Sequence, residues 1–193
     1  MNSDKKTWTI EYNKRYSEIW IKLRRDNYYH FFYNETCVDT KKLITLFNAS
    51  SIIDYGCGNA ISTRDIKNIS VFKFDPFVEE YKTRPTECAD LVIAYNVLST
   101  VEIEHLEAVI EDIFNFSNDV VVFSIPISKR NEKTSEWYLN KVKNEDFDML
   151  EHNEIDKVKF YDATKRHLSL SESNTFLYLY FRKKLNAKNK FNT

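Results

Sequence analysis

The chain of 193 residues contains only two glycines, and they stand almost side by side at Gly56 and Gly58. Average glycine usage of about 7% would place roughly a dozen or more in a chain of this length. Glycine permits a left-handed backbone and a close approach of the main chain to a ligand. A chain that has so few glycines and keeps two of them together is therefore expected to need a tight turn here.

The residues on either side of the glycines have the order strand, turn, helix. An apolar pair followed by Asp54 is typical of the end of a buried strand. Residues 60–67 are expected to begin a helix with exposed N–H groups. A second strand at 71–74 ends in Asp75, about 20 residues after Asp54, where an acid meets ribose hydroxyls in nucleotide sites. The sequence therefore predicts a site for a nucleotide-type ligand.

Three glycine patterns can be compared with this turn. A dinucleotide fingerprint, Gly-x-Gly-x-x-Gly, needs a glycine where the chain has Ile61. A Walker-type phosphate loop needs Gly-Lys-Ser/Thr, which does not follow. The methyltransferase pattern Asp-x-Gly-x-Gly-x-Gly ends in a small residue where the chain has Ala60. The residues favour the methyltransferase pattern.

At these residues the sequence resembles the class I S-adenosylmethionine-dependent methyltransferases. It looks most like small phage and bacterial members whose first motif reads Asp-Tyr-Gly-Cys-Gly. The resemblance covers roughly residues 30–130 and is most specific at 54–58, 74–77 and 89–97. It implies an α/β, Rossmann-like fold with a mostly parallel sheet, helices on both faces and a C-terminal antiparallel hairpin.

The resemblance implies S-adenosyl-L-methionine as the cofactor. Asp54 and the glycines would hold its methionyl part, and Asp75 would hold its ribose. Asn96, in the strand expected at 89–98, would face cofactor and acceptor and orient rather than deprotonate, because an amide is no strong base. Residues expected to contact the cofactor are Asp54, Tyr55, Gly56, Cys57, Gly58, Asp75, Pro76, Phe77 and Asn96. The strand ends at Tyr95 and Pro126 would frame the acceptor.

The chain departs from the family pattern in two places. Residues 99–100 read Ser-Thr where many relatives have Glu-His, so a catalytic role of that histidine cannot be carried over. Residues 77–89 are too few for a helix and a third strand, so the third-strand region is expected to be shortened. The acid that often binds adenine is then missing, and Glu87 is the candidate to replace it. The acids at 79–80 are expected to face solvent.

The second half of the chain has the pattern of a helix followed by strands. A helix over 101–116 places on one face Ile103, Leu106, Ile110, Ile113 and Phe114. Glu104, Glu111 and Asp112 fall away from that stripe and are expected in solvent. Further expected elements are a strand at 119–125 ended by Pro126, a helix at 134–145, and hairpin strands at 158–161 and 176–181.

The expected organisation is an aromatic-rich helical cap at 1–45, a methyltransferase-like domain at 46–184 and a basic tail at 185–193. Aromatic residues recur every four positions between residues 12 and 20, as on one helix face. That stripe either packs on the sheet or covers the active site. The basic tail is expected to be solvated, with steering of an anionic acceptor as the alternative.

Composition limits the compartment and the class of partner. With 28 basic and 29 acidic side chains, the net charge of −1 argues against duplex nucleic acid held by phosphate neutralisation. No apolar run reaches the ~18 residues of a membrane span, and charges in the first twenty residues argue against a secretory signal. Three scattered cysteines indicate a reducing cytoplasm, and the histidines and cysteines lack metal-ligand spacing, so no metal is expected. The Lys-, Asn- and Ile-rich composition is typical of an AT-rich genome. Together with the resemblance to phage proteins it implies a phage or bacterial source, with the host cytoplasm as the location if it is viral.

The sequence thus predicts methyl transfer from S-adenosylmethionine to an unidentified acceptor, with a small molecule favoured over nucleic acid. The alternative is a non-catalytic module that binds the cofactor or a nucleotide on the same fold. The shortened third-strand region and the missing Glu-His motivate this alternative, and the two retained acids, Asp54 and Asp75, count against it.

Overall fold

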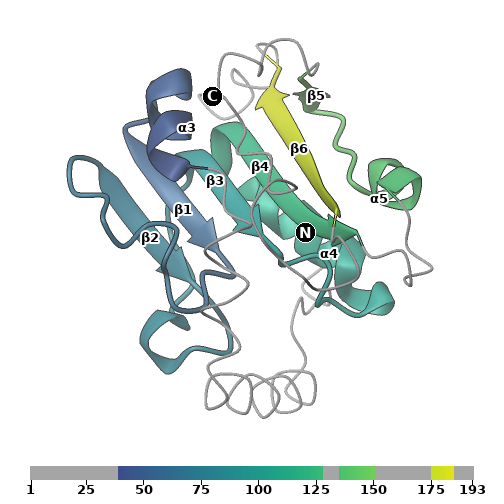
Figure 1. Ribbon diagram of the computed structural model, residues 1–193, viewed down its shortest axis with the longest axis horizontal. Coiled ribbons are helices and arrows are strands. Elements are labelled where there is room, and N and C mark those ends of the chain that lie inside the picture. The colour runs from purple at the N-terminus through teal and green to yellow at the C-terminus, as the bar shows by residue number, and fades with distance from the viewer. Residues whose placement is uncertain (1–38, 128–134, 151–174, 185–193) are drawn as a thin grey trace, which may run out of the picture.

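A computed structural model describes residues 39–127, 135–150 and 175–184 (Figure 1). The predicted strand at 158–161, the aromatic stripe and the basic tail lie outside these described residues. The elements, in chain order, are α3 (Thr40–Phe47), β1 (Ser51–Tyr55), β2 (Ser70–Phe74), the short 3-10 helix η1 (Glu79–Tyr81), β3 (Ala89–Tyr95), α4 (Ile103–Asn115), β4 (Ser117–Ile127), α5 (Ser135–Lys141), β5 (Phe147–Met149) and β6 (Thr175–Lys183).

The six strands form one sheet in the order β2-β1-β3-β4-β6-β5. The strands β2, β1, β3 and β4 run parallel, whereas β6 is antiparallel to β4 and to β5. The central strands are rich in buried aliphatic residues, as expected for parallel strands covered on both faces. The predicted α/β fold, with its parallel sheet and antiparallel C-terminal strands, is confirmed, and β5 is the outer partner of β6.

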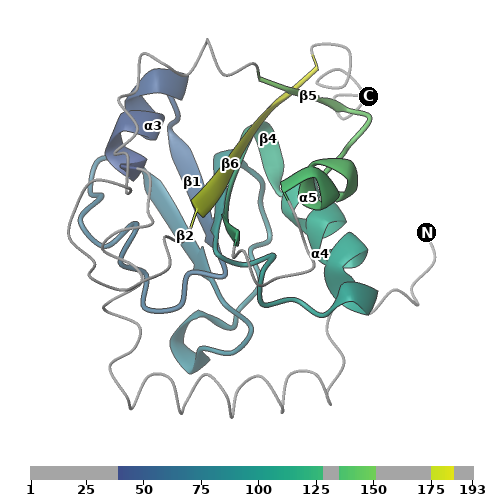
Figure 2. The ribbon, with the colours of Figure 1, turned by 45° about the vertical axis from the view of Figure 1, so that its right-hand side comes forward.

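Helices cover both faces of the sheet (Figure 2). On one face, Leu43 of α3 belongs to a buried cluster with Ile52 of β1 and Ile93 of β3. On the other face, Leu106 of α4 packs in a cluster that also contains Tyr138 of α5. Because neighbouring strand residues alternate between the faces, the sheet is buried from both sides. No helix in the described ranges has the length and hydropathy needed to cross a bilayer.

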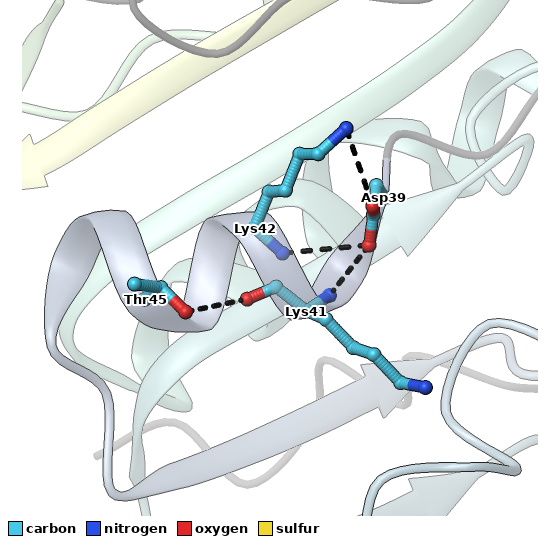
Figure 3. A network of polar contacts seen from close by, with 4 residues as sticks. All are labelled: Asp39, Lys41, Lys42 and Thr45. Atoms are coloured by element: carbon cyan, nitrogen blue, oxygen red, sulfur yellow. Dashed lines mark hydrogen bonds and ion pairs between the residues drawn. The ribbon is translucent and has the colours of Figure 1, made fainter.

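The short helix α3 begins at a capping aspartate (Figure 3). The Asp39 carboxylate accepts hydrogen bonds from the backbone N–H groups of Lys41 at 3.1 Å and Lys42 at 3.4 Å. A carboxylate at this position satisfies N–H groups that have no partner within the helix. At the other end Asn48 adopts a left-handed conformation, with φ 52°, and ends the helix. The helix lies across the domain boundary expected at residue 45, and that division stays a prediction.

The helix expected at 60–67 is wrong, because residues 58–65 form a series of turns. Ala60 has φ 53°, in the left-handed region, which is incompatible with a right-handed helix. The Thr63 side chain is turned inward, where its hydroxyl donates a 2.8 Å hydrogen bond to Asp54. The shortened third-strand region is confirmed, since residues 75–88 contain η1 and no strand.

Three expected details of the second half need correction. Ile103 is 63% exposed, because it is the first residue of α4 and the buried residues of that helix begin at Leu106. Pro126 does not end β4, which continues to Ile127. The pairing of β3 with β4 stops at Ser124. On the side of β4 that faces away from β6, position 126 therefore has no strand partner that needs its N–H, and a proline is tolerated there. The helix α5 ends at Lys141, before the expected 145.

Candidate functional site

The turn after β1 alternates between ordinary and left-handed backbone. Gly56 and Gly58 have φ values of 70° and 52°, and Ala60 has 53°. These are the three small positions of the predicted glycine pattern, and each has a conformation that an L side chain rarely adopts. A Cβ on Gly56 would lie 2.5 Å from a methyl carbon of Val97, so the loop after β3 packs directly against this turn. The turn therefore requires glycine at 56 for both conformation and space.

The end of β2 holds the turn through main-chain hydrogen bonds. The carbonyl oxygen of Phe74 accepts from the N–H groups of Gly56 at 2.7 Å and Cys57 at 3.1 Å. These contacts place the ends of two neighbouring parallel strands against one turn. In open α/β sheets, the carboxyl ends of the strands are where ligands bind.

The Asp75 carboxylate connects the glycine turn to the segment after β2. Its Oδ2 accepts a 2.8 Å hydrogen bond from the N–H of Gly58, and its Oδ1 accepts a 2.9 Å bond from the N–H of Phe77. The N–H of Asp75 itself donates to the carbonyl of Tyr81 at 2.9 Å. With 5% of its surface exposed, Asp75 is fixed in the position where the sequence places a ribose-binding acid.

Asp54 is the second buried acid of the site and is 2% exposed. Burial raises its pKa from 3.8 to about 7, against the hydrogen bond from Thr63, which lowers it. The negative charge of Asp75 raises the pKa of Asp54 further, and the positive charge of Lys73 lowers it. Near neutral pH this carboxyl is therefore divided between its two forms, and a bound cation would favour the ionised form.

The side chains of Tyr55 and Cys57 are turned into the core. The Tyr55 hydroxyl donates a 2.7 Å hydrogen bond to Asp112 of α4, on the face opposite to Asp54. The Cys57 side chain is buried, and burial raises the pKa of its thiol, so a thiolate nucleophile is not favoured there. Of the nine residues expected to contact a cofactor, these two can offer only their backbone groups.

Asn96 follows β3 directly and lies next to the glycine turn. Its backbone has φ 61°, its N–H donates to the carbonyl of Ser124 at 2.7 Å, and its carbonyl accepts from the Ser99 hydroxyl at 3.1 Å. Val97, the next residue, is the one that faces Gly56. The ends of β1, β3 and β4 thus meet around Asn96. Tyr95, expected to frame the acceptor, is buried among core residues.

Pro76 and Phe77 are partly exposed at the end of β2, beside Asp75. Glu87 is misplaced by the sequence prediction. It lies two residues before β3 begins, at the amino end of a parallel strand, whereas the glycine turn lies at the carboxyl ends. The seven residues of β3 separate the two edges by about 20 Å. Glu87 is therefore no candidate for contacting adenine.

The remaining acids near the strand ends lie at the surface. Glu79 and Glu80 are exposed, as expected, and Glu79 pairs with Lys82. Glu102, Glu104 and His105 bring possible metal ligands within 4.8 Å of one another at the start of α4. Exposed acidic groups commonly have this arrangement without an ion.

Three residues without a predicted site role bond to predicted site residues or to the partners of these residues. Thr63 was expected in a helix, and Arg84 had no expected role. Asp112 was expected in solvent, but it is 4% exposed and accepts from Tyr55 and Arg84. Its position three residues after the buried Val109 was an available signal that it belongs to the covered face of α4.

Comparison of the sequence with protein-family models and with curated proteins gives no match. Among solved structures, the chain is similar to the 16S rRNA methylase RmtB, with 16% identity, a TM-score of 0.50, and coverage of 91% of this chain and 76% of that one. It also matches an rRNA methylase from Escherichia coli, with 16% identity, a TM-score of 0.46 and coverage of 84% and 64%. A third match is magnesium protoporphyrin IX methyltransferase (ChlM) from Synechocystis PCC 6803 with bound SAM, with 13% identity, a TM-score of 0.43 and coverage of 89% and 79%.

The similarity to RmtB indicates a shared fold. The protein has a Rossmann-like fold found in methyltransferases, and the expected resemblance is confirmed at that level. At 16% identity the comparison carries no activity or acceptor from RmtB to this chain.

Proposed function

We propose that this protein binds S-adenosylmethionine between the glycine turn and the end of β2 and transfers its methyl group to an acceptor at the ends of β3 and β4. The observation that carries the proposal is the 2.8 Å hydrogen bond from Gly58 to Asp75. It joins the predicted methionine-binding turn and the predicted ribose-binding acid, which are 17 residues apart in the chain, into one buried structure.

The chemistry of the two carboxyl groups fits the cofactor. A carboxylate oxygen accepts more than one hydrogen bond, so Asp75 can hold Gly58 and also accept from ribose hydroxyls. The ionised form of Asp54 would complement the positively charged ammonium and sulfonium groups of the methionyl part. Pro76 and Phe77, which are partly exposed, would border the adenosine part.

When bound, S-adenosylmethionine supplies an electrophilic methyl group on a charged sulfur, and the cofactor carries the difficult chemistry. The protein has to align the acceptor, exclude water and accept a proton where the acceptor carries one. We assign Asn96 an orienting role, because its amide can donate and accept hydrogen bonds but cannot remove a proton. A general base is not part of the proposal.

A small-molecule acceptor is favoured over nucleic acid, and a cytoplasmic, phage or bacterial context is part of the same proposal. The net charge of −1 supports the choice, since a protein that neutralises many phosphates needs an excess of basic side chains. The exposed acids Glu104 and Glu107 of α4, which follows the Asn96 segment, would also repel a polyanion.

A second candidate is a module that binds the cofactor or a nucleotide without catalysis. It is favoured by the turns at 58–65 in place of the expected helix and by the shortened connection at 75–88. Incubation with the cofactor and a screen of acceptors separates the two candidates. Methylated product supports the enzyme, and binding without product in a broad screen supports the module.

The first test is calorimetric titration of the purified full-length chain with S-adenosylmethionine, S-adenosylhomocysteine and NAD. Binding of the first two and not of NAD is expected. The variant Asp75→Asn should weaken binding at least tenfold. Asp90→Asn is the matched control, because Asp90 also accepts two backbone N–H groups, from Ser50 at 2.8 Å and Ser51 at 3.2 Å, near the amino end of β1. Equal loss of binding in both variants, or no binding to the unmodified protein, would contradict the proposal.

A further inference from the structure

A buried carboxylate on α4 joins two segments that are far apart in the chain. The Oδ2 atom of Asp112 accepts a 2.7 Å hydrogen bond from the hydroxyl of Tyr55, the last residue of β1. Its Oδ1 pairs with the guanidinium of Arg84. Arg84 belongs to the connection at 75–88 that stands where a third strand would run. One side chain thus links the end of β1 to this connection.

The ion pair lies beside a cluster of three aromatic rings, which are those of Phe116, Tyr55 and Phe74. The Arg84 guanidinium lies 5.0 Å from the centroid of the Phe116 ring, and Phe116 lies 6.2 Å from the Tyr55 ring. The Tyr55 ring meets the Phe74 ring edge-on at 5.1 Å. Contacts of these kinds are favourable and depend on ring orientation. The Tyr55 side chain is therefore held by two aromatic rings and by the hydrogen bond of its hydroxyl.

These contacts end at the main-chain groups that shape the turn. Tyr55 directly precedes Gly56, and Phe74 supplies the carbonyl that accepts from the N–H groups of Gly56 and Cys57. A change in the Tyr55 ring would therefore be transmitted to both strand ends that hold the turn.

We propose that Arg84 is a positioning residue of the cofactor site, which through Asp112 and Tyr55 holds the glycine turn in its binding conformation. The proposal rests on the proposed function insofar as the turn is taken to bind S-adenosylmethionine. Arg84 contacts Asp112 and the Phe116 ring, neither of which belongs to the turn, so it acts through its partners.

The two partners of the ion pair differ in their exposure to solvent. The Arg84 side chain is 50% exposed, so its guanidinium lies partly in solvent. Asp112, in contrast, is buried, and burial raises its pKa, while the Tyr55 hydroxyl and the Arg84 charge lower it. Without Arg84, this carboxylate would be left with a less favourable charge environment beside the Tyr55 hydroxyl.

The test compares Arg84→Met with Arg182→Met. Arg182 is a matched control, because its side chain is 47% exposed, pairs with Asp119 at 3.5 Å and lies 5.5 Å from the Phe47 ring centroid, in contact with α3. Two quantities are measured on the full-length protein. They are the Kd for S-adenosylmethionine by calorimetry, and the exchange rates of the backbone amides at 56–58, without cofactor, by NMR.

Arg84→Met is expected to raise the Kd at least fivefold and to speed amide exchange at 56–58 at least fivefold. Arg182→Met should leave both within twofold of the unmodified protein. Arg84→Lys, which keeps the charge but not the planar geometry, should give intermediate values. Tyr55→Phe removes only the hydroxyl and should reproduce the faster exchange, which keeps the test available if Arg84→Met does not fold.

Unchanged exchange at 56–58 in Arg84→Met and Tyr55→Phe would overturn the proposal. Faster exchange spread equally over β3 and β4 would also overturn it, because it would indicate general loss of stability. If the unmodified protein does not bind S-adenosylmethionine, the proposed function fails. The exchange measurement still decides whether Arg84 positions the turn, since it uses the protein without cofactor.

Discussion

Gly56 and Val97 are packed so closely that a Cβ on the glycine would lie 2.5 Å from the valine Cγ2. The contact joins the turn after β1 to the loop after β3, which are the two parts of the candidate site. It also makes the glycine at 56 a steric requirement in addition to a conformational one, since its φ is 70°.

Gly56→Ala is therefore expected to destabilise the protein by about 2–4 kcal/mol, from left-handed strain and overpacking together. Adding Val97→Ala should relieve the overpacking part. Urea denaturation of the two single variants and the double variant would measure this as a coupling energy of about 1 kcal/mol or more. Additive losses would show that the two side chains do not compete for space.

Ala60→Gly is expected to stabilise the protein by about 0.5–1 kcal/mol, because alanine is strained at φ 53° and glycine is not. Ala94→Gly, at a buried position within β3, is the control and should destabilise. Both are measured by thermal or urea unfolding. A loss of stability in Ala60→Gly would mean that residue 60 is not held in the left-handed region.

The stability of the protein should depend on pH through Asp54. Its pKa is raised from 3.8 to about 7 in the folded protein, so between these values the folded state holds a proton that the unfolded chain releases. The free energy of unfolding is therefore expected to fall as pH rises from about 4 to 7, by up to about 4 kcal/mol. Asp54→Asn should remove that slope and be the more stable form at pH 8. Parallel stability curves for the two proteins would contradict the prediction.

The same group should make cofactor binding depend on pH, if the cofactor is S-adenosylmethionine. Only the ionised form of Asp54 attracts the cationic cofactor, so affinity should rise by about tenfold between pH 6 and pH 8. Calorimetry at the two pH values measures it, and Asp54→Asn should bind with a weak affinity that varies little with pH. Equal Kd values for the unmodified protein at pH 6 and pH 8 would exclude this role of Asp54.

The strands and the glycine turn could be predicted because their signals are local. Buried aliphatic runs mark β3 and β4, and scarcity of glycine marks the turn. The helix at 60–67 could not be excluded from its residues, since only the folded turn shows Ala60 in the left-handed region and Thr63 bonded to Asp54. Local propensity is overridden there by tertiary contacts.

Site residues that act over long sequence distances were harder to find. The prediction of Asp75 as a site residue rests on its spacing from Asp54, which is a known pattern, and the structure bonds it to Gly58. Asp112 and Arg84 are 28 residues apart and meet only because the fold brings α4 against the connection at 75–88. Glu87 was misjudged because its position in the sequence, just before β3, hides which edge of the sheet it occupies.

The short connection after β2 has a consequence for association between copies of the chain. Among the described residues β2 is an edge strand of the sheet, and Phe72 is an exposed apolar side chain on that strand. Open edges can recruit another strand and start aggregation, and a lysine on such a strand opposes this by its charge and hydration. Lys73 occupies that position, with its ammonium 5.5 Å from the Tyr81 ring centroid. Its replacement by an apolar residue would make this protein prone to edge-to-edge assembly.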